Sequence, residues 1–337
     1  MVISNICITF ASEKSVYLNI ILIFIQIAYY LQQQPNLVKI KKLIKLTMKN
    51  NYIKSPLNYT GGKHKLLPQI MPLFPKEINT FIDLFTGGCN VAVNVNANKI
   101  IANDFEEHII NIFKTFQSDN IENLIFNIEN IIKEFNLTME NSEGFNRFRN
   151  LYNETIVNGN NSQYNIDIML FTLICYSFNH QFRFNSKGEF NMPFGKNRSQ
   201  WNDTMKKNLI NFHKSIIDKN IIFTNNDFRK LKIDKLSCND FVYCDPPYLI
   251  TCATYNEKDG WNEQCETDLL SLLDSLNSKS VKFALSNVLF SKGKTNDLLI
   301  EWSKKYNVHH LDYTYQNCNY HTKDKSSKPD EVLITNN

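Results

Sequence analysis

Residues 80–88, TFIDLFTGG, combine a short apolar, β-prone run with a double-glycine turn. Helical propensity resumes after Asn90, so the segment predicts a strand, a tight turn and a helix. Glycines in such a turn let the backbone approach a ligand closely, although a Gly-Gly turn alone is weak support for a ligand site. Its spacing differs from the dinucleotide fingerprint, so NAD binding is not indicated.

The rest of the chain alternates in the same way. Further β-prone runs lie at 99–102, 221–224, 241–244, 281–286, 308–315 and 332–335. Helical spacing of apolar residues covers 66–74, 106–135, 144–178, 269–276 and 297–305, whereas 183–201 is non-helical. This alternation predicts an α/β sheet with helices on both faces. Such sheets bind ligands beyond the carboxyl ends of their strands, where three clusters lie: DLFTGG, Asn103-Asp104 and Asp245-Pro246-Pro247-Tyr248.

The DPPY cluster at 245–248 carries the most specific chemistry. Two consecutive prolines end the strand ladder and present carbonyl acceptors without N–H donors. The Asp245 carboxylate and the Pro246 carbonyl can together accept two hydrogen bonds from an NH2 group, and the Tyr248 ring can stack on a flat base. These features are typical of a site for an extruded nucleobase amine, and a plain strand end with a turn is the alternative.

Asp104 has two interpretations. An acid at the end of the second strand, about 20 residues after the first, is where a ribose hydroxyl pair is held in nucleotide-binding sheets. The same residue could instead cap a helix that begins near Phe105.

Composition limits the possible partners. The chain has 337 residues and a net charge of +4, all of it from residues 1–47, which hold five lysines and one acid. The rest of the chain is neutral, so a nucleic-acid surface must be a local patch. Eight scattered cysteines show no zinc-ligand spacing, which indicates free thiols in a reducing cytoplasm and no metal site.

The N-terminus contains a nearly continuous apolar stretch at residues 16–31. It is too short and interrupted for a membrane span, which needs about 20 apolar residues, and no signal-peptide cleavage site follows it. We expect translation to start at Met48, with residues 1–47 outside the folded protein and no stable membrane association. A genuine helix that forms an apolar leader is the alternative.

DPPY with a glycine turn upstream resembles the amino-methyltransferases that act on adenine N6 or cytosine N4. The order of Tyr59-Thr60-Gly61-Gly62-Lys63, DLFTGG, a long insert and DPPY is similar to the Dam-type, D12-class DNA adenine methyltransferases, from about Met48 to Asn336. RFNSKGEFNMPFG at 183–195 resembles the family's recognition hairpin, and Tyr255-Asn256, FALSN at 283–287 and DEVLI at 330–334 also fit. One departure is Cys89, which stands where the family often has a third glycine.

The resemblance implies a Rossmann-like S-adenosylmethionine-dependent methyltransferase fold with a mixed, mostly parallel sheet formed by residues 48–105 and 220–337. A mainly helical DNA-recognition domain carrying a β-hairpin would be inserted at 106–219. Asp245, Pro246, Pro247 and Tyr248 would be catalytic. The implied cofactor contacts are Tyr59, Lys63, Phe85, Gly87, Asp104, Asp227, Phe228, Asp245 and Tyr255. Among them, Lys63 would lie near the cofactor carboxylate, Asp104 at the ribose and Asp227-Phe228 beside the adenine.

A basic segment indicates where DNA would bind. Residues 183–214 hold seven basic and two acidic side chains, interleaved with aromatic ones, which suits phosphate contact and groove entry. The resemblance implies that Arg183 reads a base edge, as Arg forks do with guanine. The other expected DNA contacts are Asn185, Lys187, Asn191, Pro193, Lys196 and Arg198. A solvated charged loop is the alternative.

We therefore expect a monomeric, cytoplasmic enzyme that methylates adenine N6 in double-stranded DNA after base flipping, within GATC by the likeness of its recognition segment. Restriction–modification, replication, repair and viral settings all stay open. The alternatives are cytosine N4 or RNA adenine as the target, or a catalytically silent DNA-binding relative. A nucleotide-dependent oxidoreductase is disfavoured because the fingerprint is absent.

Overall fold

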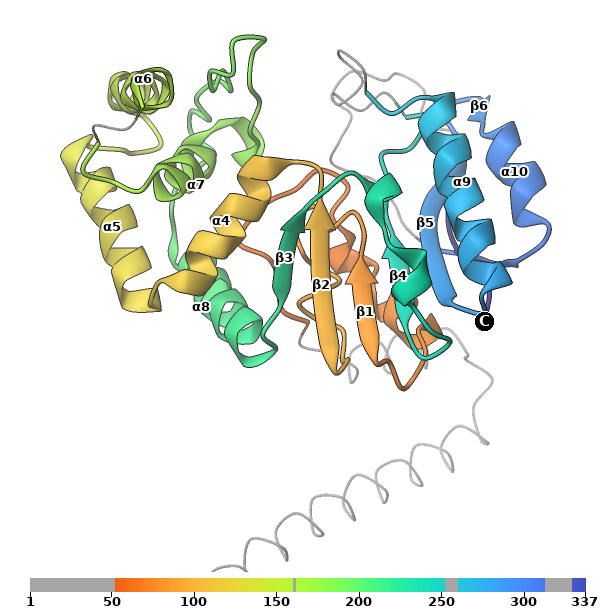
Figure 1. Ribbon diagram of the computed structural model, residues 1–337. Helices are drawn as coiled ribbons and strands as arrows, with labels where there is room; N and C mark the ends of the chain where they lie inside the picture. Colours follow the sequence, from red (N-terminus) through yellow and green to blue (C-terminus); the bar gives the residue numbers. More distant parts are fainter. Residues whose placement is uncertain (1–51, 160–161, 252–259, 313–328) are drawn as a thin grey trace, which may run out of the picture. The chain divides into compact units, whose positions relative to one another are not determined.

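The computed structural model describes residues 52–159, 162–251, 260–312 and 329–337 (Figure 1). Its strands form one eight-stranded sheet in the order β3-β2-β1-β4-β5-β8-β7, with β6 paired to β5. The strands are β1 Thr80–Asp83, β2 Lys99–Asp104, β3 Ile222–Asn225, β4 Phe241–Cys244, β5 Lys282–Ser291, β6 Lys294–Thr295, β7 Asn307–His310 and β8 Asp330–Thr335. The neighbouring strands β3, β2, β1, β4 and β5 run parallel to one another, whereas β8 runs antiparallel to β5 and β7. The expected mixed, mostly parallel sheet is confirmed.

The strand order reverses at β1. From β1 the chain moves outward to β2 and β3 on one side, and later to β4 and β5 on the other. Open α/β sheets bind ligands beyond the carboxyl ends of the strands at such a switch point. The ends of β1 and β4 carry the glycine turn and the DPPY segment, so the topology itself brings these two motifs together.

Helices cover both faces of the sheet. They are α3 Leu67–Ile70, α4 Glu107–Ser118, α5 Ile121–Glu134, α6 Ser142–Asn158, α7 Ile166–Tyr176, α8 Asp203–Asp218, α9 Glu263–Ser278 and α10 Asp297–Ser303. Successive strand residues point to opposite faces. Phe81 and Phe241 join the apolar cluster of α4 to α8, whereas Ile82 and Val242 join that of α9 and α10. This two-sided burial is why the central strands β1 and β4 carry consecutive apolar residues.

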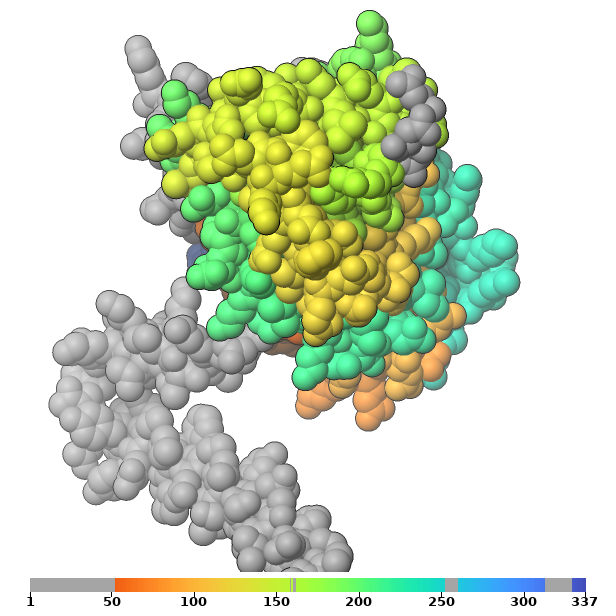
Figure 2. All heavy atoms as spheres, turned by 90° about the vertical axis from the view of Figure 1, so that its left-hand side faces the viewer, coloured from red at the N-terminus to blue at the C-terminus, as the bar shows by residue number. Residues whose placement is uncertain are grey.

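The residues between β2 and β3 form a mainly helical insertion, α4 to α8 (yellow to green in Figures 1 and 2). Its centre is α7, in which every residue from 168 to 176 is buried. Helices α4, α5 and α6 pack around α7, and α4 also packs on β2 and β3. A separate recognition domain at 106–219 remains a prediction, because one apolar cluster runs through the insertion and onto the sheet.

Several boundaries differ from those expected. Residues 91–94 form a turn and not a helix, and Lys219 Nζ, just after α8, donates to the carbonyls of Val93 and Val95 at 2.9 and 2.6 Å. The pattern at 106–135 is two helices, because the Asn120 side chain caps a new helix at the Asn123 amide. The recognition hairpin is a loop with isolated antiparallel bridges, Phe184 with Phe190 and Ser177 with Phe194, and has no regular strands.

Two further expectations concern the N-terminus and association with a membrane. Residues 1–47, and with them the expected start at Met48, lie outside the described residues. Within the described ranges, no helix has the length and apolar character to cross a membrane.

Candidate active site

The glycine turn after β1 is shaped by a close approach to Tyr59. Gly87 has a positive φ of 46°, and a Cβ atom there would lie 2.8 Å from the Tyr59 ring. A side chain at Gly88 would come within 3.0 Å of the Tyr59 Cβ atom. Cys89, in the place of a third glycine, also has a positive φ of 59° and is fully buried. The turn therefore holds the backbone open with two glycines, and the cysteine is accommodated at the cost of backbone strain.

Asp104 at the end of β2 holds this turn from the next strand. One carboxylate oxygen accepts the Gly87 amide at 2.7 Å and the other accepts the Glu106 amide at 2.9 Å. Asp104 is not the helix cap, because Glu106 caps α4 through the His108 amide. Burial raises the pKa of Asp104 to about 6, although these amide bonds work against the rise.

Asp83, the last residue of β1, is an acid to which the sequence patterns assign no role. Its side chain is 1% exposed. One carboxyl oxygen accepts from the Thr86 hydroxyl and the Ala92 amide, while Oδ1 has no partner among the described residues. Burial, with the nearby charge of Asp245, raises the pKa of Asp83 to about 8. The available signal was a single acid inside an apolar strand.

The DPPY carboxylate sits in a compact polar cluster. Lys63 Nζ lies 2.7 Å from Asp245 Oδ1, and the Tyr248 hydroxyl lies 3.2 Å from the same oxygen. Both donors also approach Glu331 Oε1, at 3.6 Å for Lys63 and 2.8 Å for Tyr248. Lys63 further donates to the Gly61 carbonyl at 2.9 Å. All described partners of Asp245 converge on Oδ1, which leaves Oδ2 for a ligand.

Lys63 and the two carboxylates stabilise each other's charged forms, although the carboxylates repel one another. Burial alone lowers the pKa of Lys63, but Asp245 and Glu331 outweigh it and the net shift is upward, so Lys63 stays charged. Burial raises the pKa of Asp245, and the Lys63 ammonium offsets only part of that rise. A buried carboxylate beside a fixed cation is thus kept able to accept hydrogen bonds.

An aromatic cluster lies next to the glycine turn. Phe85, Phe228 and Trp261 have ring centroids 5.4 to 5.6 Å apart. The Trp261 indole N–H donates to Glu266 at 2.6 Å, and Glu266 is itself fully buried. Trp261 lies in no motif that the sequence alone reveals. Asp227, adjacent to Phe228, accepts from the Arg229 amide and guanidinium at 2.8 and 3.0 Å.

The sequence profile of the D12 class N6 adenine-specific DNA methyltransferases matches residues 59–317. The chain belongs to this family. It is 50% identical over 91% of its length to the type II methyltransferase M.FokI of Planomicrobium okeanokoites, covering 47% of that protein. It is 44% identical over 92% of its length to the modification methylase StsI of Streptococcus sanguinis, covering 48% of it. The chain therefore spans about half the length of these relatives.

Two more distant likenesses complete the comparison. The DNA adenine methylase of Escherichia coli K12 is 22% identical to this chain, and the match covers 75% of this chain and 85% of the length of that methylase. A solved putative rRNA-methylase from Clostridium thermocellum has a TM-score of 0.33 and 11% identity, over 82% of this chain and 96% of its own. That score is too low to support any conclusion.

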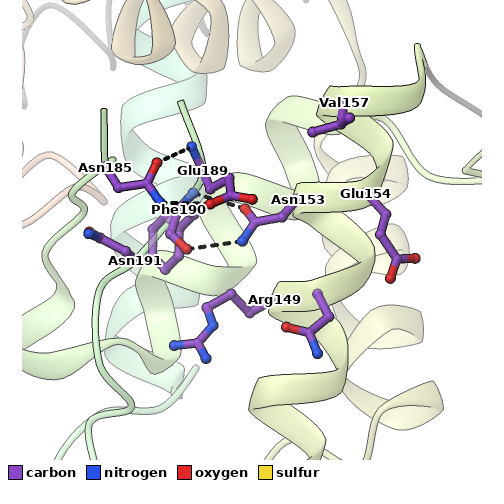
Figure 3. Close-up of a pocket in the computed structure, with 9 residues that line it drawn as sticks. Arg149, Asn153, Glu154, Val157, Asn185, Glu189, Phe190 and Asn191 are labelled. Atoms are coloured by element: carbon purple, nitrogen blue, oxygen red, sulfur yellow. Dashed lines mark hydrogen bonds between the residues drawn. The ribbon is translucent and has the colours of Figure 1, made fainter. Parts of the chain in front are cut away.

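The predicted recognition segment of this D12-class chain is held on both sides. Asn153 of α6 binds the backbone of Phe190 twice, donating to its carbonyl at 3.2 Å and accepting its amide at 2.8 Å (Figure 3). Asn58 donates to the Asn179 carbonyl at 2.9 Å, and Gln181 donates to the Thr60 hydroxyl at 3.1 Å. These bonds tie the predicted DNA-reading loop to α6 and to the segment that carries Tyr59 and Lys63.

Within the loop, the predicted DNA contacts are ordered against one another. Arg183 Nε donates to the Asn191 side chain at 2.9 Å, and the Asn185 side chain organises the turn by accepting the Lys187 amide at 2.9 Å. The Arg198 guanidinium lies 4.7 Å from the Phe178 ring centroid. Lys187, Pro193 and Lys196 lie along the same loop, with Lys187 and Lys196 exposed. A pocket of about 500 Å³ lies between this loop and α6, lined by polar residues such as Arg149 and Asn153 and by the apolar Val157 and Phe190 (Figure 3).

The structure thus brings together Tyr59, Lys63, Gly87, Asp104 and the DPPY segment at one edge of the sheet. Pro246 and Pro247 leave the β4 ladder as predicted, with Pro246 buried. The predicted cofactor contact Tyr255 lies outside the described residues. No group of metal-ligating side chains occurs in the described ranges.

Proposed function

We propose that the chain transfers a methyl group from S-adenosylmethionine to the exocyclic N6 of adenine in double-stranded DNA. The observation that carries the proposal is the DPPY carboxylate at the switch point of the sheet, held at Oδ1 by Lys63 and Tyr248, with no partner of Oδ2 among the described residues. Family membership supports the same reaction. Because the chain spans about half the length of M.FokI and StsI, its activity as a whole protein is part of this proposal.

The residues around the glycine turn fit the cofactor. Asp83 Oδ1 is a buried acceptor with no described partner, suited to the cofactor's amino group, and Asp104 faces the same turn from β2. Gly87 lets the backbone approach closely, with Tyr59 packed on it. Phe85 and Phe228 supply apolar walls for a purine ring. When bound, S-adenosylmethionine supplies an electrophilic methyl group.

The DPPY residues would act on the target amine. Asp245 Oδ2 and the Pro246 carbonyl each accept a hydrogen bond from one N–H group of the amine. The nitrogen lone pair is thereby turned out of conjugation with the ring. Tyr248 supplies the stacking face. Positioning and fixed dipoles, and not a covalent enzyme intermediate, account for the acceleration. A base within a duplex cannot reach this site, so the proposal includes extrusion of the target nucleotide.

The recognition sequence is a finer part of the proposal. GATC follows only from the likeness of residues 183–195 to the family's recognition segment. The type II modification methylases among its relatives support a role in a restriction–modification system. We expect it to act as a monomer in the cytoplasm, where DNA and cofactor are both available.

The test is transfer of labelled methyl from S-adenosylmethionine by the full chain to duplexes that contain or lack GATC, followed by nucleoside analysis and sequencing of the modified sites. Label on N6-methyladenine supports the reaction, and its sequence context decides the site. Label on N4-methylcytosine or on RNA alone contradicts the proposed target. Asp245→Ala should lower kcat by at least about a thousandfold in a folded protein, and retained turnover would overturn the role of Asp245.

A further inference from the structure

Glu331 is a buried acid that no part of the proposed reaction uses. It lies in β8, whose antiparallel pairing with β5 sets it opposite Val288. This brings a residue from the end of the chain to the edge where DPPY lies. Its side chain is only 1% exposed. A carboxylate that is buried to this extent is destabilising unless cations or hydrogen-bond donors compensate it.

Two of the groups that compensate Glu331 also hold Asp245. The Tyr248 hydroxyl lies 2.8 Å from Glu331 Oε1 and 3.2 Å from Asp245 Oδ1. Lys63 Nζ lies 3.6 Å from the first carboxylate and 2.7 Å from the second. The Lys63 ammonium also lies 5.1 Å from the centroid of the Tyr248 ring. The two carboxylates therefore share two donors, Lys63 and Tyr248.

We propose that Glu331 is a positioning residue for the transfer: it anchors the Tyr248 hydroxyl and shares the Lys63 ammonium, so that Asp245 presents its unengaged oxygen to the target amine. The proposal rests on the proposed function of the same site. Without Glu331, the Tyr248 ring loses its stronger hydroxyl contact. Lys63 then pairs with Asp245 alone and competes more strongly with the amine for that carboxylate. Glu331 itself touches neither the amine nor the methyl donor.

A charge role for Glu331 also has a signature in pH dependence. The groups that face Asp245 are Lys63 from the 3-10 helix at 63–65, Glu331 from β8, Asp83 from β1, and Tyr243, Cys244 and Tyr248 from its own segment. Burial is the largest cause of the raised pKa of Asp245, and the charge of Glu331 adds to it. Removing that charge lowers the pKa, so Asp245 stays ionised to lower pH.

The experiment compares Glu331→Gln, Tyr248→Phe and the double variant with the full wild-type chain. Glu331→Gln should lower kcat by roughly 10- to 100-fold, as expected for a misplaced reacting group. Its Kd for S-adenosylmethionine should stay within about threefold, since the glycine turn is untouched and Lys63 keeps its ion pair with Asp245. The acid limb of kcat should move to lower pH. The double variant should be no slower than the slower single variant, because both changes break one arrangement.

Asp330→Asn is the matched control. It removes the preceding carboxylate of the same strand, which pairs with His310 on the surface at 2.7 Å. It should leave kcat and its acid limb unchanged. An unchanged kcat in Glu331→Gln would overturn the proposal. So would a lower kcat with an unmoved acid limb, because a purely structural loss does not alter the titration of Asp245.

One further measurement separates this proposal from the proposed function. Carbon-13 NMR of carboxyl-labelled aspartates follows the titration of Asp245 without turnover, with Asp245→Asn to assign the signal. If the wild-type chain transfers no methyl group, the proposed function fails, but the titration still decides the positioning role. A lower Asp245 pKa in Glu331→Gln supports it, and an identical pKa overturns it.

Discussion

At the scale of single residues, Asp83 combines deep burial with an unmatched carboxyl oxygen, and this gives it a measurable effect on stability. Its pKa is about 8 in the folded chain, against 3.8 as the ordinary value. The unfolded chain loses this proton at lower pH, so folding stability falls as the pH rises from about 4 to about 8, by up to about 1.4 kcal/mol per pH unit from this group.

Asp83→Asn removes that dependence, because an amide stays neutral throughout. We expect the free energy of unfolding to fall less steeply between pH 5 and pH 8 in the variant than in the wild type, as measured by urea denaturation at each pH. Asp104 titrates in the same range, with a pKa of about 6, and contributes to both proteins. Equal slopes for the two proteins would show that Asp83 is already ionised at neutral pH.

Gly87 gives a second residue-level prediction. Gly87→Ala adds a methyl group 2.8 Å from the Tyr59 ring at a positive φ, so the ring or the turn must move. We expect S-adenosylmethionine binding to weaken at least about tenfold, which corresponds to about 1.4 kcal/mol. Calorimetric titration of the cofactor measures this.

The control for this prediction is Gly159→Ala. Gly159 ends α6 with a φ of 68°, and a Cβ atom added there would meet no other atom within 4 Å. The change adds backbone strain of about 1 kcal/mol without touching the site. Cofactor affinity should therefore survive in this variant. If both variants lose affinity equally, general destabilisation and not the Tyr59 contact is the cause.

How much of the site the sequence predicts depends on what kind of signal each residue carries. Asp245 and Gly87 lie in local motifs whose chemistry can be read directly, and the structure brings both to the switch point. Glu331 belongs to a strand whose partner lies about 40 residues earlier in the chain, and only the pairing of β8 with β5 shows that it reaches Asp245. Trp261 is likewise assigned by packing against Phe85 and not by any pattern.

At the scale of secondary structure, asparagine caps set many of the helix starts. Asn165 accepts both the Asp167 and the Ile168 amides at the start of α7. Because α7 is the buried centre of the insertion, we expect Asn165→Ala to reduce the free energy of unfolding by about 1 kcal/mol. Chemical denaturation measures the change, and Asn165→Asp should retain most of the stability. A loss equal to that of alanine in the aspartate variant would argue against capping.

These caps also explain where apolar periodicity was insufficient. The pattern at 106–135 predicts one long helix, yet Asn120 begins a second one, α5. The sequence patterns predict no helix at 203–218, where Asn202 caps α8. After Asn90, local propensity favours a helix, but Lys219 binds the carbonyls of Val93 and Val95 and the turn prevails. Periodicity locates apolar faces, whereas caps and tertiary hydrogen bonds decide the ends.

At the scale of the whole molecule, the alternation of strands and helices predicts the α/β class but not the order of the strands. The reversal at β1 and the antiparallel β8 depend on contacts between segments far apart in sequence. The order of motifs, together with the family resemblance, did predict a helical insertion between β2 and β3. The pairing of β8 with β5, which the sequence patterns do not predict, also brings Glu331 next to Asp245.

The distribution of charge makes a final prediction about DNA binding. Outside residues 1–47 the chain is neutral, so phosphate contacts must come from a local excess such as the one at 183–214. Lys187 and Lys196 are exposed there. If each neutralises one phosphate, Lys187→Ala with Lys196→Ala should reduce the slope of log affinity against log salt by about 2. Duplex binding across a salt series measures this slope.

The double variant Lys292→Ala with Lys294→Ala is the control that separates the effect of where the lysines lie from the effect of net charge. These lysines are exposed at the β5–β6 turn, and their removal changes the net charge by the same amount. If long-range attraction by net charge governed binding, both double variants would lose the same slope. Direct phosphate contact predicts a loss only for the recognition-segment pair. Cofactor affinity should be unchanged in both, because neither pair approaches the glycine turn.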